Sequence, residues 1–246
     1  NALTIIELLR RRAAIPAGIL VVSPFTYGRV RRFARREGWK AILDAVPRAL
    51  GLDERQDEQD AVDRLMRRHC IEHGSLRSWS DEHEVPYRRV TNVNDEEAVE
   101  WLDGKKVDWV IYGGGGILGS DFIQAAHGRI LNPHSGPLPE VRGMNAAEWT
   151  ILLGIEPTVT VHVIDEGIDT GGIVASRRVR LDGCTTIQEL RSRHVAEGIE
   201  LILDILDDPP AEVPPRRTDA DTHRQCFVLS PPLRALVDRK LKALSG

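Results

Sequence analysis

Two segments of the sequence carry an amide, an imidazole and carboxylates, the side chains that acyl-group transfer requires. The first segment begins with Asn132 and His134, and the second, later in the chain, contains Asp165 and Asp169. An amide donates hydrogen bonds to a carbonyl oxygen that becomes negatively charged, while an imidazole and a carboxylate move or hold a proton. Spacing alone leaves open which of the two carboxylates approaches the imidazole.

Short apolar runs precede both segments and predict the strands that position them. These runs alternate with helical patterns, which favours an α/β fold with an open, mostly parallel, Rossmann-like sheet and helices on both faces. The expected strands are residues 18–23, 85–90, 107–112, 130–131, 159–164 and 171–176, and the expected helices are residues 1–12, 95–102 and 185–206. Residues 107–112 are expected to be a central buried strand. Asn132 and His134 are expected on a loop at a strand end, where open α/β sheets bind ligands.

The chain divides into a principal domain, residues 1–206, and a short C-terminal extension, residues 207–246. The extension holds a Pro-rich connector and an amphipathic helix that is expected to pack on the core or across a homodimer. Residues 27–73 differ in composition from their surroundings and are interpreted as an insertion. Its arginine cluster between Arg29 and Arg36 is either a solvated helix face or a phosphate-binding patch. Because the chain opens with a helix, we expect a first strand upstream of residue 1.

Composition limits the function classes. The 246 residues are 41% hydrophobic, which suits one full core, and the formal net charge of −4 argues against a surface built to hold nucleic acid. The three cysteines lack a CxxC spacing, which favours a reducing cytoplasm over a disulfide framework or a zinc site. The sequence contains neither an apolar run as long as a membrane span nor a secretory leader pattern.

Other polar or glycine-rich features have simpler explanations. The run Gly113 to Gly116 follows an expected strand, and it is either a permissive loop or a place where the backbone approaches a flat ligand. His162 alternates with apolar neighbours, which favours a packed or edge histidine over a ligand-binding one. The remaining histidines have no motif context and receive no role.

The two chemical segments together resemble those of the folate-dependent formyltransferases, which include glycinamide ribonucleotide, methionyl-tRNA and amino-sugar formyltransferases. That family has Asn-x-His, then Ser-x-Leu-Pro and a glycine, and later Asp-x-Gly-x-Asp-Thr/Ser-Gly. The positions that match are Asn132, His134, Leu138, Pro139, Gly143, Asp165, Gly167, Asp169, Thr170 and Gly171. The chain departs from the family at Gly136, where serine is usual, and at Gly172, where proline is common.

The resemblance implies that Asn132, His134 and Asp169 are the catalytic trio and that 10-formyltetrahydrofolate is the formyl donor. In this chemistry Asn132 would bind the oxyanion, His134 would relay a proton, and Asp169 would hold the imidazole and raise its pKa. No metal is required. The resemblance also implies a cofactor pocket formed by Tyr112, Gly113, Gly114, Gly115, Gly116, Ile117, Leu118, Ile164, Asp165, Glu166, Gly167 and Ile168.

The expected function is N-formyl transfer to a small amine such as an amino-sugar nucleotide, an amino acid derivative or a glycinamide ribonucleotide-like metabolite. A tRNA acceptor is not expected, because the tRNA-acting members carry a further C-terminal barrel domain that these 246 residues do not accommodate. One alternative is a formyltetrahydrofolate hydrolase, in which water replaces the amine. The other is a non-catalytic folate- or nucleotide-binding module.

Overall fold

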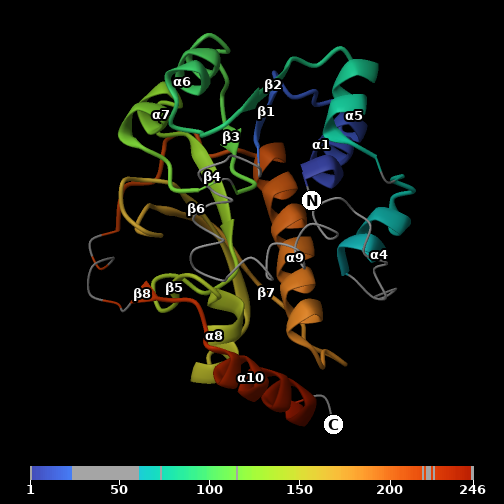
Figure 1. Cartoon of the computed structure of the whole chain (residues 1–246), viewed down its shortest axis with the longest axis vertical. Coiled ribbons are helices and arrows are strands. Elements are labelled where there is room, and N and C mark those ends of the chain that lie inside the picture. Colours follow the sequence, from blue (N-terminus) through green and yellow to red (C-terminus); the bar gives the residue numbers. More distant parts are fainter. Residues whose placement is uncertain are drawn as a thin grey trace, which may run out of the picture.

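The computed structural model describes residues 2–23, 61–72, 74–114, 116–217, 219, 223 and 225–244. Within these ranges helices surround a small sheet (Figure 1). The helices are α1 (Ala2–Arg11), α4 (Ala61–Arg68), α5 (Leu76–Glu82), α6 (Glu96–Asp103), α7 (Ser120–Ala125), α8 (Ala146–Leu153), α9 (Ile187–Asp207) and α10 (Pro231–Leu244). The strands are β1 (Ile19–Val22), β2 (Tyr87–Val90), β3 (Val110–Ile111), β4 (Ile130–His134), β5 (Arg142–Gly143), β6 (Thr158–Val163), β7 (Ile173–Arg178) and β8 (Gln225–Cys226).

The predicted α/β class is confirmed, and the sheet is mixed in its strand directions. Strands β3 and β4 are parallel, as are β1 and β2, which form a separate pair among the described residues. Strands β6 and β7 continue the β3–β4 sheet in antiparallel fashion, in the order β3-β4-β6-β7. The antiparallel half includes the strand on which the chemical residues lie, so the register between β4 and β6 decides which side chains meet.

Two strand predictions need correction. The expected central buried strand over residues 107–112 is only the two residues of β3, and both are half-buried. The expected loop after residues 130–131 is instead a continuation of β4, which runs through Asn132 to His134. Pro133 lies within this strand, opposite Val161 in the antiparallel pairing of β4 with β6.

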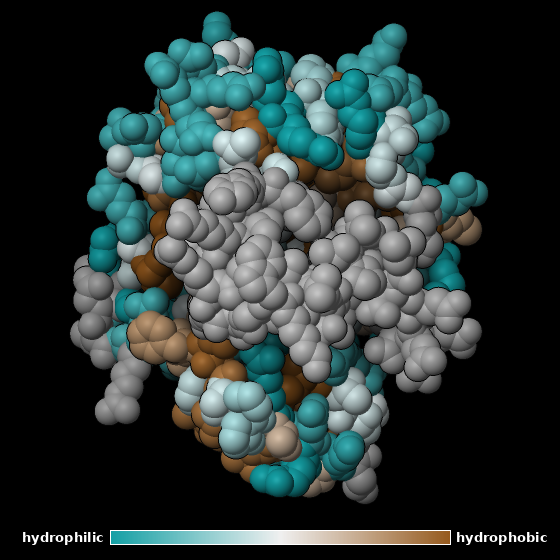
Figure 2. All heavy atoms as spheres, viewed as in Figure 1, coloured by the Kyte–Doolittle hydropathy of each residue, from teal (hydrophilic) through white to brown (hydrophobic). Residues whose placement is uncertain are grey.

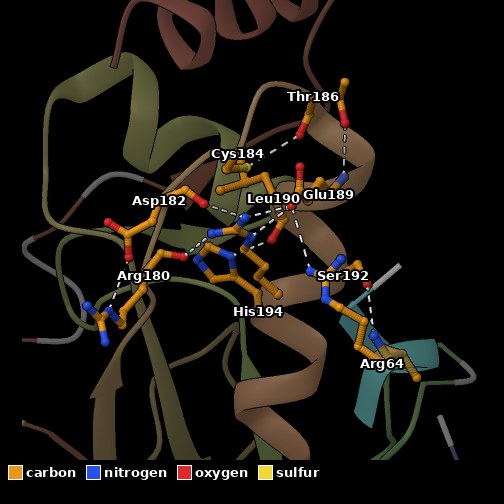
Figure 3. A network of polar contacts seen from close by, with 11 residues as sticks. Arg64, Arg180, Asp182, Cys184, Thr186, Glu189, Leu190, Ser192 and His194 are labelled. Carbon is orange, nitrogen blue, oxygen red and sulfur yellow. Dashed lines mark hydrogen bonds and ion pairs between the residues drawn. The ribbon is translucent and has the colours of Figure 1, made fainter. Parts of the chain in front are cut away.

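The long helix α9 lies against the sheet (Figure 1). Its Leu201 and Ile202 pack against Val159 and Val161 of β6 in one buried apolar cluster. The helix was predicted from residue 185 and begins at Ile187, because the Thr186 hydroxyl caps it by accepting a hydrogen bond from the Glu189 backbone N–H over 3.2 Å. This cap lies in a polar network that also includes Cys184, Asp182 and Arg180 in the preceding loop (Figure 3).

Helix α4 belongs to the principal core although it falls within the predicted insertion. Its Val62, Leu65 and Met66 pack with residues of α1 and α9 in a buried cluster. The Val62 N–H also donates to the Ser192 hydroxyl of α9 over 3.2 Å, and Arg64 lies 3.7 Å from the Glu189 carboxylate (Figure 3). The rest of the predicted insertion up to residue 60, including the arginine cluster, lies outside the described residues.

The C-terminal helix α10 packs on the same fold, as expected. Its Val237 and Leu241 are buried against α8 and the start of α9, and its Asp238 accepts a hydrogen bond from the Ile187 N–H over 3.0 Å. Apolar side chains reach the surface in the lower part of Figure 2, where Figure 1 places α8 and α10. In the described ranges none of the helices combines the length and apolar character needed to cross a membrane.

Candidate active site

Four polar side chains from three segments meet beside the central sheet, and we call them the Asn–His–Asp cluster: Asn132, His134, His162 and Asp169. Asn132 Nδ2 lies 3.0 Å from His162 Nε2. The Asp169 carboxylate lies between the two imidazoles, with Oδ2 3.6 Å from His134 Nδ1 and Oδ1 3.5 Å from His162 Nε2. The amide, imidazole and carboxylate that the sequence singled out are therefore brought together by the fold.

His162 was expected to be a packed or edge histidine, and instead it belongs to the cluster. The antiparallel register places it directly opposite Asn132, and its side chain is 2% exposed. Its Nδ1 lies 2.9 Å from the Val163 carbonyl oxygen, which can only accept, so Nδ1 carries the proton and Nε2 accepts from the Asn132 amide. His162 thereby fixes the orientation of that amide. Only the pairing of two distant strands reveals this contact, so alternation along a single strand could not predict it.

His134 is held by the loop that follows it. Its Nε2 donates to the Val141 carbonyl oxygen over 2.7 Å, which leaves Nδ1 on the side of Asp169. Burial lowers the pKa of His134 below its ordinary value, although the Asp169 charge acts in the opposite direction. Asp169 thus raises the pKa of His134 as expected, but burial has the larger effect and the pKa is lowered overall. His134 is neutral near pH 7.

Asp169 is ionised and tightly held. Its backbone has φ of 52°, in the left-handed region that aspartate tolerates better than most residues. The Gly143 N–H donates to Oδ2 over 2.7 Å. Burial by itself raises the pKa of Asp169. The imidazoles of His162 and His134, when they carry a proton on the ring nitrogen that faces Asp169, and the Gly143 N–H together lower it to about 2.

The structure separates the two carboxylates whose roles spacing left open. Asp165 Oδ1 accepts from the Thr170 hydroxyl over 2.5 Å and from the Gly167 N–H over 3.1 Å, so it closes the loop on itself. The loop is tight, because a Cβ added at Gly171 would lie 1.9 Å from the Val163 carbonyl oxygen. Asp165 therefore shapes the loop that presents Asp169 to the imidazoles.

Both departures from the family pattern occur where neighbouring atoms leave room only for glycine. A Cβ at Gly136 would lie 2.9 Å from the Ala146 Cβ and 3.3 Å from His134 Nε2. A Cβ at Gly172 would lie 2.4 Å from the Pro214 carbonyl oxygen. The larger residues usual in the family would therefore displace the His134 loop or the segment around Pro214.

The first loop of the predicted cofactor pocket is an exposed turn with one buried end. The Tyr112 hydroxyl accepts from the Gly116 N–H over 3.0 Å and closes the turn, in which Gly113, Gly114 and Gly116 are exposed. Ile117 is 73% exposed, whereas Leu118 is buried in the apolar cluster around Phe122. Gly115 lies outside the described residues. Leu118 thus serves the core, and Ile117 is the apolar side chain available to a ligand.

The second loop borders a pocket of about 310 Å³. Ile164, Asp165 and Glu166 line it together with Pro214 and Arg216, whereas Gly167 and Ile168 do not. Residues 112–118 do not line this pocket either, so the described residues do not join the two predicted loops in one cavity. The volume is at the lower end of the range for small-molecule sites.

A comparison of the sequence with protein families identifies residues 43–206 as a match to the family described as formyl transferase. Among curated proteins, methionyl-tRNA formyltransferase of Finegoldia magna is 30% identical over 119 residues, which are 48% of this chain and 38% of that protein. Phosphoribosylglycinamide formyltransferase of Bacillus subtilis is 33% identical over 78 residues, 31% of this chain and 40% of that protein. The chain thus spans less than half the length of these relatives.

Among solved structures, the formyltransferase PseJ from Anoxybacillus kamchatkensis, in complex with a UDP-linked formamido sugar and tetrahydrofolate, matches with a TM-score of 0.47. The identity is 23%, over 63% of this chain and 82% of that chain. Phosphoribosylglycinamide formyltransferase from Streptococcus pneumoniae TIGR4 matches with a TM-score of 0.47 and 26% identity, over 54% and 78% of the two chains. The family match covers the whole Asn–His–Asp cluster and most of the chain. On that match, the chain belongs to the formyl transferase family.

Proposed function

We propose that this protein transfers a formyl group from 10-formyltetrahydrofolate to a primary amine, with Asn132, His134 and Asp169 as its catalytic residues. The observation that carries the proposal is the Asn–His–Asp cluster. Asp169 lies 3.6 Å from the neutral imidazole of His134 and 3.5 Å from His162, and His162 in turn lies 3.0 Å from the Asn132 amide. Membership of the formyl transferase family supports the same chemistry.

Asn132 is suited to bind the oxyanion. Its amide nitrogen carries two hydrogens, and the contact with His162 Nε2 uses one of them. The second hydrogen is available to the formyl oxygen as that oxygen becomes negatively charged. A donor of this kind typically lowers the barrier by about 3 to 4 kcal/mol, because it is already oriented before the reaction begins.

His134 is suited to accept a proton from the attacking amine. With Nε2 bonded to the Val141 carbonyl, Nδ1 has a free lone pair and faces Asp169. As the amine nitrogen bonds to the formyl carbon, its proton moves to Nδ1, and Asp169 stabilises the resulting imidazolium. The imidazolium then returns the proton to the folate nitrogen as the bond from that nitrogen to the formyl carbon breaks. The predicted proton relay through His134 is kept, and its lowered pKa favours this accept-then-donate order.

The residues around the cluster fit a folate donor in part. The pocket beside Ile164, Asp165 and Glu166 combines an apolar wall with carboxylates that suit the amino groups of a pterin. The exposed Ile117 offers apolar surface on the first predicted loop. We retain the predicted cofactor residues 112–118 and 164–168, with Leu118 reassigned to the core.

A small metabolite remains the proposed acceptor, but the length of the chain does not exclude tRNA. The aligned segments cover only 38% to 47% of the first methionyl-tRNA formyltransferases that match. Because methionyl-tRNA formyltransferases recur among the relatives, formylation of aminoacyl-tRNA is the second candidate function.

The proposal is tested by incubating the protein with 10-formyltetrahydrofolate labelled with ¹³C in the formyl group and a panel of amines. The panel contains an amino-sugar nucleotide, amino acids, glycinamide ribonucleotide and methionyl-tRNA. The expected result is amine-dependent release of tetrahydrofolate, with the label in the N-formyl product. Release of labelled formate without an amine would instead identify a hydrolase. Donor binding without any release would identify a non-catalytic folate-binding module.

A further inference from the structure

Two arginines beside the Asn–His–Asp cluster form no ion pair with any carboxylate in the described part of the chain. Arg142 lies on β5, and its side chain is buried, with the whole residue 8% exposed. Within the part of the chain that the structure describes, Nε and Nη1 of Arg142 are inaccessible to solvent and have no hydrogen-bond partner. The same two atoms of Arg217 are equally buried and unpartnered.

Both arginines belong to segments that contact Asp169. The residue after Arg142 is Gly143, whose N–H binds the Asp169 carboxylate over 2.7 Å. Arg217 donates through Nη2 to the Asp169 backbone carbonyl over 2.7 Å. The charge of Arg217 also contributes to the lowered pKa of His134, so its guanidinium is close enough to act on the cluster.

The nearby carboxylates do not neutralise these two guanidinium groups. Asp169 is bound to the Gly143 N–H and faces the two imidazoles. Asp165 is bound to Thr170 and Gly167, and its second oxygen lies 3.7 Å from Arg216. Burying an unpaired guanidinium costs folding free energy. Arginine is also the residue best suited to bind a carboxylate or a phosphate through two parallel hydrogen bonds.

We propose that Arg142 and Arg217 form an oxyanion-binding subsite for the acceptor, so that the amine substrate carries a phosphate or carboxylate group. This inference rests on the proposed formyl transfer and narrows its substrate class to anionic amines. We assign the two arginines to the acceptor and not to the folate donor. Neither arginine lines the pocket beside Asp165 that is proposed for the donor, whereas the neighbouring Arg216 does. The subsite therefore lies on the Asp169 side of the cluster.

The subsite can be tested without any formyl donor. Thermal unfolding of the wild-type protein is followed during titration with inorganic phosphate and, separately, with acetate, alongside Arg142→Gln and Arg217→Gln. Arg180→Gln is the matched control, because the Arg180 side chain is 87% exposed and pairs with Asp182 at the surface. A ligand at concentration c that binds only the folded state raises the free energy of unfolding by RT ln(1 + c/Kd), so the melting temperature rises with the concentration of the ligand.

The expected result is stabilisation of the wild type and Arg180→Gln by phosphate, acetate or both, with affinity about 10- to 100-fold weaker in each subsite variant. The stronger anion then indicates a phosphate- or carboxylate-bearing acceptor. Without anions, Arg142→Gln should unfold no more easily than the wild type, because it removes an unpaired buried charge. Arg142→Lys, which retains the charge but loses the planar fork, should show intermediate affinity.

Three results would overturn the subsite. One is the absence of stabilisation of the wild type by either anion, and another is equal stabilisation in all variants. The third is unchanged anion binding with weaker tetrahydrofolate binding in the variants, which would assign the arginines to the donor. These outcomes are independent of formyl transfer: anion binding without any transfer would refute the proposed function alone, and transfer without anion binding would refute the subsite alone.

Discussion

Replacing Asp169 by asparagine preserves the shape of the side chain and removes a charge that the fold stabilises. The pKa of Asp169 is lowered from 3.8 to about 2, and its side chain is 15% exposed. A shift of this size corresponds to about 2 kcal/mol of unfolding free energy. Because the pKa is lower in the folded state, this stabilisation is complete well above pH 3.8 and is lost as the pH falls toward 2. About half of it is lost by pH 3.

We therefore expect Asp169→Asn to lower the unfolding free energy by about 2 kcal/mol at pH 7 and by about half as much at pH 3. Urea unfolding at pH 7, 5 and 3, followed by tryptophan fluorescence, measures both differences. Asp182→Asn is the control, since its carboxylate is 80% exposed and a surface ion pair contributes little. An Asp169→Asn protein as stable as the wild type at pH 7, or a difference that persists unchanged at pH 3, would refute this reasoning.

Three further outcomes follow from the site. Asn132→Ala should lower kcat for formyl transfer by about 10²- to 10³-fold with little change in donor affinity, as measured by tetrahydrofolate release and donor titration; a wild-type kcat would rule out the oxyanion role. Gly136→Ala should cost about 1 to 3 kcal/mol in urea unfolding, because its Cβ would crowd Ala146 and His134; an unchanged stability would show that the loop adjusts freely. The acid limb of the kcat/KM profile should fall below the ordinary histidine pKa of 6.5 and move lower still in Asp169→Asn, whereas a limb above 6.5 would contradict a buried, neutral His134.

Local sequence patterns predicted helix α9 and the two polar segments that meet at the site, because each of these features depends on residues a few positions apart. The role of Asp165, which spacing left open, follows from its hydrogen bond to Thr170. The pairing of Asn132 with His162 depends on the antiparallel register of β4 and β6, which no single segment encodes. In the same way, the lowered pKa of His134 follows from burial, which is a property of the packed molecule.

The proposed anion-binding role of Arg142 and Arg217 could not be predicted from the sequence either. Arg142 lies in a motif segment, but only its burial without a partner distinguishes it from an ordinary structural arginine. Arg217 follows a Pro-rich stretch and approaches the site only because that stretch folds back over the Asp169 loop, where its side chain meets a backbone carbonyl.

The central claim is that His134 and Asp169 act as one unit on the formyl carbon, and a double-mutant cycle on the rate of formyl transfer tests it most directly. The measurement compares His134→Ala, Asp169→Asn and the double variant with the wild type, and uses His69→Ala as a control histidine outside the cluster. We predict that each single change lowers kcat by at least about 10²-fold and that the double variant is no slower than the slower single variant, because residues that act together are not additive. Wild-type rates in either single variant, or losses that multiply in full, would contradict the account.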